Sequence, residues 1–172
     1  DCKALTTYMK AMLKSVGIES FYTIIKAGEN NTEIDINLPS QQFNHVILMI
    51  PSEKDTIWLE NTSSALPFNY LGTLTQNRYA LVINGEKSQL VKTPELSIND
   101  VLIERSYNFQ ATNNNEVQID IDLFLRGKSF ENFRYFISEK DEERQSDEIN
   151  RHHGIKDFKI NNWDIIDLHR DS

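Results

Sequence analysis

Three side chains in the first part of the chain could together carry out nucleophilic chemistry: Cys2, His45 and Glu60. A thiol becomes a reactive thiolate near neutral pH when a base or a cation stands beside it. A histidine can serve as both the base and the cation, because thiolate and imidazolium stabilise each other. A carboxylate on the far ring nitrogen fixes the tautomer of the histidine. Together these residue types indicate attack on an acyl carbonyl, such as that of an amide.

Each of these residues also has an ordinary structural explanation. A single cysteine is more often a small core residue than a nucleophile. A histidine on a strand is commonly a structural hydrogen-bond donor, and a carboxylate at a strand end is usually solvated. The chemical hypothesis therefore requires the fold to bring the three side chains together, since none of them is informative alone.

Cys2 lies at the start of a predicted helix. Asp1 is suited to cap its N-terminus, Leu5 and Met9 recur at helical spacing, and Gly17 stands where a glycine commonly ends a helix. The first turn of a helix stabilises an anion by roughly 0.3–1 kcal/mol. Because Cys2 belongs to the same apolar stripe as Leu5 and Met9, we expect its side chain to point inward.

His45 and Glu60 lie on the two arms of a predicted β-hairpin that spans Gln42 to Thr62. If Ile50 pairs with Asp55 across a four-residue loop, His45 lies directly opposite Glu60. Directly opposite residues share a face of the sheet, with Cβ atoms roughly 5 Å apart. A slip of one residue would place them on opposite faces. We predict the register that pairs His45 with Glu60.

The remaining elements predict an α+β fold in two domains that meet near residues 94–99. Residues 1–96 are expected to form a nucleophile helix packed on a mostly antiparallel sheet, with a second hairpin around Asn84-Gly85. Residues 97–172 are expected to form a β-sandwich-like domain with a helical insertion. The elements predicted in that second domain are a strand from Val101 to Gln110, an alternating strand from Val117 to Leu125, a short helix from Ser129 and a last strand from Phe158.

The composition argues against some classes of function. The net charge of −8 is unfavourable for a protein that binds nucleic acid, which would carry basic patches. No apolar run approaches the ~20 residues of a membrane-spanning helix. With a single cysteine, the chain cannot form an internal disulfide, so its stability must come from its core.

Several stretches of the sequence resemble motifs of the transglutaminase-like superfamily. Asp1–Leu5 resembles the start of its nucleophile helix, Gln42–Ile47 its histidine strand and Trp58–Thr62 its acid strand, with similar separations. Pro67–Gly72, followed by Arg78–Ile83, resembles a bacterial branch in which a β-rich domain follows the core. The resemblance is closest over the first half of the chain.

The resemblance implies that residues 1–96 are the C-terminal portion of a transglutaminase-like, or papain-like, core. Cys2 would be the nucleophile, His45 the general base and acid, and Glu60 the acid that orients the imidazole. The implied reaction is attack on a peptide or amide bond through a thioester acyl-enzyme. Resolution by water would make a peptidase or amidase and resolution by an amine a transamidase; we expect hydrolysis. A peptide or protein substrate is implied. We expect no cofactor, and no metal site at His152-His153, because neighbours in sequence point apart and no third ligand is evident.

The sequence departs from the family pattern in two respects. The superfamily usually has aspartate where this chain has Glu60, and the extra methylene moves the carboxylate by about one bond length. The family core also has helices before the nucleophile, and they supply an oxyanion-hole group that is often worth ~10²–10³ in rate. We therefore expect a missing N-terminal segment or domain, and little or no activity of this chain on amides. The expected location is periplasmic or secreted.

The alternative hypothesis is a non-catalytic transglutaminase-like scaffold or binding module at the cell envelope. In that case the acidic second half would bind a partner such as a peptide or a glycan. Phe68 and Tyr70 follow the acid strand in an irregular stretch. They are candidates to line a cleft, and simple packing is the alternative for both.

Overall fold

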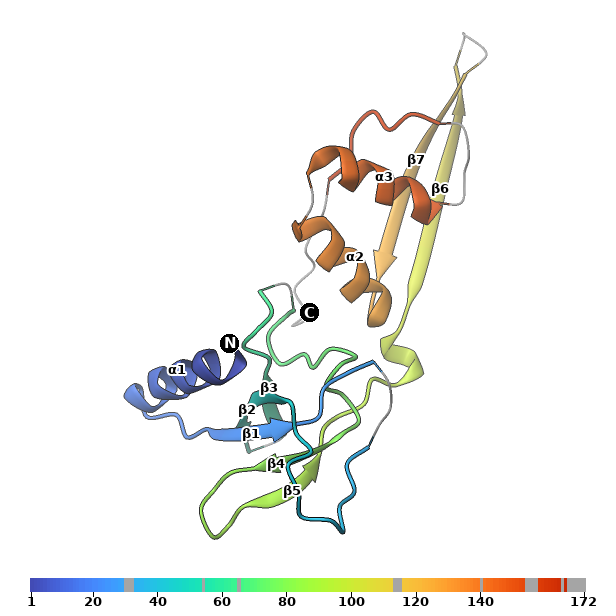
Figure 1. Cartoon of the computed structure of the whole chain (residues 1–172). Helices are drawn as coiled ribbons and strands as arrows, with labels where there is room; N and C mark the ends of the chain where they lie inside the picture. The colour runs from blue at the N-terminus through green and yellow to red at the C-terminus, as the bar shows by residue number, and fades with distance from the viewer. Residues whose placement is uncertain are drawn as a thin grey trace. The chain divides into compact units, whose positions relative to one another are not determined.

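The computed structural model describes residues 1–29, 33–53, 55–64, 66–112, 116–139, 141–153, 158–164 and 166. The chain divides into two units, Asp1–Leu96 and Ser97–Ser172, within the stretch where the sequence pattern changes. Both units contain helices and antiparallel strands, so the fold is mixed α+β (Figure 1). Within the described residues, no helix is both long enough and apolar enough to cross a membrane.

The first unit begins with helix α1, Cys2–Ser15, which packs on strands β2 and β1 of the sheet (Figure 1). The Asp1 carboxylate accepts a hydrogen bond from the Lys3 backbone N–H at 2.9 Å, so the predicted N-cap is confirmed. The apolar stripe is less buried than its spacing indicates, because Leu5 is 45% and Met12 39% exposed. The one fully buried residue of α1 is Thr6, which is polar.

A five-stranded antiparallel sheet forms the body of the first unit, with the strand order β3-β2-β1-β4-β5 (Figure 1). This arrangement confirms the predicted helix and antiparallel sheet, including the second hairpin, which joins β4 and β5. The strands are β1 (Phe21–Ile25), β2 (His45–Pro51), β3 (Thr56–Leu59), β4 (Tyr79–Val82) and β5 (Gln89–Lys92).

The predicted register of the β2–β3 hairpin is wrong by two positions, because Ile50 pairs with Ile57 and not with Asp55. The observed register leaves Asp55 exposed in the turn, where its carboxylate accepts a hydrogen bond from the next backbone N–H at 2.7 Å. Two isoleucines then face each other where the prediction set isoleucine against aspartate. Continuing this pairing makes His45 a diagonal neighbour of Glu60, and because the shift is even the two residues still share a face.

A buried apolar cluster of the first unit lies on the face of the sheet that also carries His45, while Val46 and Leu48 are buried on the other face. Ile25 pairs with His45 on one side and with Ala80 on the other, and directly paired residues share a face. Burying each large apolar side chain of this kind stabilises the fold by about 1.5–3 kcal/mol. The buried cluster consists of Ile25, Ile47, Trp58, Leu71 and Ala80.

The second unit contains a two-stranded antiparallel sheet and two helices among its described residues. The alternating strand is confirmed, and the strand expected at Val101 begins at Ile103. The predicted last strand from Phe158 is wrong for residues 158–164, which are irregular; their polar residues interrupt any alternation. The elements are η1 (Ile98–Asp100), β6 (Ile103–Ala111), β7 (Val117–Leu125), α2 (Lys128–Glu139) and α3 (Glu142–His153).

Candidate functional site

The structure brings the predicted His45 and Glu60 side chains into direct contact. Nε2 of His45 lies 2.9 Å from Oε2 and 3.1 Å from Oε1 of Glu60. The two side chains are only 17% and 8% exposed. Diagonal neighbours across a strand pair are about 7–8 Å apart at the backbone, which long side chains can span. The additional methylene of glutamate relative to aspartate therefore suits the observed register.

Glu60 is held ionised by its surroundings. Burial raises the pKa of the Glu60 carboxyl, but hydrogen bonds from His45 and Thr62, together with the charge of His45, outweigh burial and lower the pKa overall. Thr62 donates to Oε1 through its hydroxyl at 2.5 Å and through its backbone N–H at 3.1 Å. An ionised carboxylate only accepts hydrogen bonds, so Nε2 of His45 carries a proton and Nδ1 remains for chemistry.

The backbone on which His45 stands is fixed by the residue before it. The Asn44 side chain accepts a hydrogen bond from the backbone N–H of Ala27 at 2.7 Å and donates one to its carbonyl at 2.8 Å. It thus takes the place of one more backbone pair at the end of the β1–β2 ladder. This contact limits the freedom of the first residue of β2, which is His45.

Cys2 occupies the first position of α1, directly after the Asp1 cap; the residue is half-buried and its thiol is outside any disulfide. Among the residues that the structure describes, no hydrogen bond joins the Cys2 thiol to His45 or Glu60. Its electrostatic neighbour is Tyr22 of β1: burial raises the pKa of the Tyr22 phenol, and the negative charge of Cys2 raises it further. The structure therefore brings together two of the three predicted residues and holds the third at the helix start.

Thr6 connects the first turns of α1 to both arms of the hairpin. Its hydroxyl donates to the carbonyl of Val46, the residue after His45, at 3.3 Å. The same hydroxyl accepts from Nδ2 of Asn61, the residue after Glu60, at 3.2 Å. Cys2 lies four positions before Thr6, on the same helix face. Sequence reasoning missed Thr6, because a threonine within an apolar stripe indicates no particular contact.

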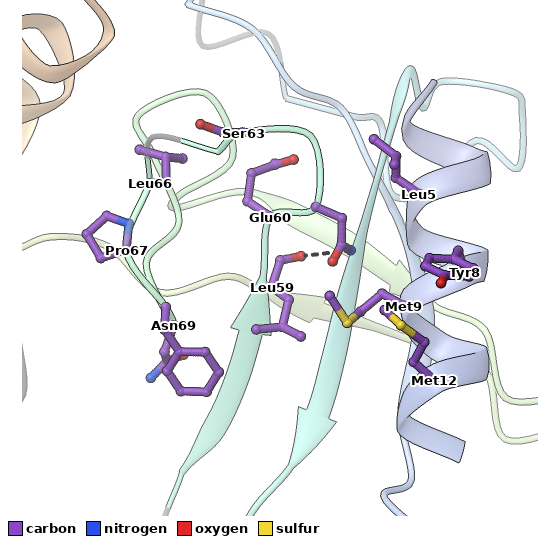
Figure 2. A pocket seen from close by; sticks show the side chains of 12 residues that line it. Leu5, Tyr8, Met9, Met12, Leu59, Glu60, Ser63, Leu66, Pro67 and Asn69 are labelled. Atoms are coloured by element: carbon purple, nitrogen blue, oxygen red, sulfur yellow. Dashed lines mark hydrogen bonds between the residues drawn. The ribbon is translucent and has the colours of Figure 1, made fainter. Parts of the chain in front are cut away.

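A pocket of about 390 Å³ lies beside these residues. Figure 2 shows α1 along one wall, the segment around Leu66 and Pro67 along the opposite wall, and Leu59 and Glu60 at the end of β3 between them. Phe68 lines the pocket, as one of the two interpretations of the sequence allowed. Tyr70 is only 5% exposed and belongs to the packed interior.

No group of three or more histidine, cysteine, aspartate or glutamate side chains gathers as a metal site within the described ranges. Comparisons with protein-family models, curated proteins and solved structures found no match. The transglutaminase-like resemblance therefore rests on the short sequence motifs around Cys2, His45 and Glu60 and on those at Pro67–Gly72 and Arg78–Ile83.

Proposed function

We propose that the first unit is part of a transglutaminase-like core that transfers or hydrolyses acyl groups of peptide or amide bonds, with little or no activity expected of this chain itself. Cys2 is the nucleophile, His45 the general base and acid, and Glu60 the orienting acid. The observation that carries this proposal is the contact of Nε2 of His45 with both carboxylate oxygens of Glu60, at 2.9 and 3.1 Å. The helix that begins at Cys2 is hydrogen-bonded through Thr6 to the residues that follow His45 and Glu60.

In the proposed reaction, Nδ1 of His45 takes the proton of the Cys2 thiol, and the sulfur attacks the carbonyl carbon. A C–S bond forms while the carbonyl electron pair moves to oxygen. When that pair returns, the C–N bond breaks, and His45 gives its proton to the departing amine. Water, deprotonated by His45, then attacks the thioester, breaks the C–S bond and releases a carboxylic acid and the thiol.

Glu60 has a defined part in this scheme. Its buried, ionised carboxylate stabilises the imidazolium that forms when His45 accepts a proton, and it keeps the ring from rotating. The two hydrogen bonds from Thr62 hold the carboxylate in turn. An amine in place of water would give transamidation; hydrolysis of a peptide or protein substrate is the outcome we propose.

A second candidate is a non-catalytic scaffold or binding module at the cell envelope. The observation that favours it is that, in the described part of the chain, the Cys2 thiol has no hydrogen bond with His45. The His45–Glu60 contact would then only stabilise the hairpin. For residues 97–172, a β-sandwich-like arrangement with a helical insertion remains a proposal, as does a periplasmic or secreted location.

Alkylation of Cys2 separates the two candidates. The chain has one cysteine, so intact mass after exposure to iodoacetamide reports on Cys2, with Cys2→Ser as the blank. At about pH 6, an ordinary thiol is almost wholly protonated and reacts slowly. We expect the wild type to react at least about tenfold faster than His45→Ala, and the control His152→Ala to react like the wild type. Equally slow reaction of wild type and His45→Ala would support the scaffold.

A further inference from the structure

We propose that the pocket between α1 and the Leu66–Asn69 segment binds an aromatic side chain of the substrate. As a statement about substrate, this inference rests on the proposed function; as a statement about binding, it can be tested without it. As Figure 2 shows, α1 and the Leu66–Asn69 segment form two walls of the pocket, and the end of β3 lies between them. Its volume of about 390 Å³ is near the lower end of the ~300–1,000 Å³ of ligand pockets.

The chemistry of the walls selects against charged groups. Among the described residues of the lining, Glu60 is the one charged residue, and its carboxylate is already engaged by His45 and Thr62. A lysine or aspartate side chain entering the pocket would lose water without gaining an ionic partner. An apolar side chain would not incur this cost, because it has no charged group to remove from water.

Within the apolar side chains, an aromatic ring fits this lining best. Tyr8 and Phe68 lie at the exposed part of the pocket, 65% and 64% accessible to solvent, and offer ring edges and faces. Met9 and Met12 offer thioethers, which make favourable contacts with aromatic rings and adapt their shape. Tyr8, Met12 and Phe68 are exposed in the free chain, as is usual for a binding surface, whereas Met9 is half-buried.

The pocket adjoins the proposed catalytic residues through Glu60, which is part of its lining. Glu60 both lines the pocket and contacts His45, so one side chain separates a ligand seated between the walls from the imidazole. The Phe68 wall is fixed to the same strand, because the backbone N–H of Trp58 donates to the side chain of Asn69 at 3.0 Å. Binding and chemistry would therefore be coupled through β3.

Methionine methyl signals provide a direct test, because the chain has only three methionines. Met9 and Met12 line the pocket, whereas Met49 packs against the core cluster and serves as the internal control. The probes are N-acetylphenylalaninamide, N-acetylleucinamide and the α-amide of N-acetylaspartic acid, whose side-chain carboxylate is free. Each is added to the full chain labelled at the methionine methyls. Each signal is assigned by the corresponding Met→Leu variant.

We expect N-acetylphenylalaninamide to shift the Met9 and Met12 signals saturably, with the Met49 signal unchanged, and to bind at least about tenfold more tightly than the other two probes. Phe68→Ser should weaken this binding, whereas Phe109→Ser, which alters a similarly exposed phenylalanine of the other unit, should not. Equal response to the three probes, or equal shifts of all three methyls, would overturn the inference.

The result of the methionine-signal test can be distinguished from the result of the alkylation test of the proposed function. A specific response at Met9 and Met12 in a protein whose Cys2 alkylates slowly would show the pocket without the enzyme. A fast, His45-dependent alkylation without any response at Met9 and Met12 would leave the function standing and reject the aromatic pocket.

Discussion

His45 and Glu60 meet across a diagonal of the β2–β3 hairpin, with Nε2 of the imidazole 2.9 Å from Oε2 of the carboxylate. In this register Glu60 is not directly opposite His45, so its carboxylate has to extend diagonally across the strand pair to reach the imidazole. Glutamate has the length to do so, whereas aspartate, the usual residue in the superfamily that this chain resembles, is shorter. The two-residue shift of register and the longer acid therefore compensate for each other.

Glu60→Asp tests this relationship. We expect the shortened side chain to lose its contact with Nε2, so that alkylation of Cys2 at about pH 6 slows by about tenfold, approaching the rate of His45→Ala. Glu60→Gln keeps the length but loses the charge, and we expect an intermediate rate. If Glu60→Asp reacts as fast as the wild type, the length of the acid does not matter.

Thr6 offers a test of how α1 is held. Thr6→Val keeps the shape of the side chain but leaves the Val46 carbonyl and the Asn61 amide without their hydroxyl partner, which should cost about 1–3 kcal/mol of unfolding free energy. Thr6→Ser should recover most of this loss. Urea unfolding measures both, with Thr7→Val, an exposed neighbour, expected to change stability by less than about 0.5 kcal/mol. Equal stability of the Thr6 and Thr7 variants would refute the role of Thr6.

The lowered pKa of Glu60 predicts how stability depends on pH. In the unfolded chain the carboxyl titrates near its ordinary value of 4.5, and in the folded chain below it. The resulting stabilisation is complete above the unfolded value and is lost as the pH falls through the lower folded value. We expect the difference in unfolding free energy between wild type and Glu60→Gln to be large at neutral pH and to disappear in acid. A difference that stays constant with pH would contradict this.

Much of the first unit could be predicted from local signals in the sequence. The Asp1 cap, the helical spacing that follows it and the Asn84-Gly85 turn each act over a few residues, and each is found where expected. The contact of His45 with Glu60 could also be predicted, because alternation along a strand fixes the face of each side chain even when the register is wrong by two positions.

The features that could not be predicted depend on contacts between distant segments. The register of the hairpin is set by which residues the sheet buries, and Asp55 alone does not reveal this. Thr6 gains its importance from Val46 and Asn61, both far along the chain. The exposure of Leu5 and Met12 likewise follows from the pocket between α1 and a later segment, which helical spacing cannot indicate.

The most direct test of the proposed function is the ultraviolet thiolate absorbance of Cys2 at about pH 6, taken as the difference between wild type and Cys2→Ser. If Cys2, His45 and Glu60 act as a unit, the wild type shows a thiolate band at this pH, and His45→Ala abolishes it. The proposed function is contradicted if the wild type shows no band until the pH range of an ordinary thiol, about 8–9, or if His45→Ala leaves the band unchanged.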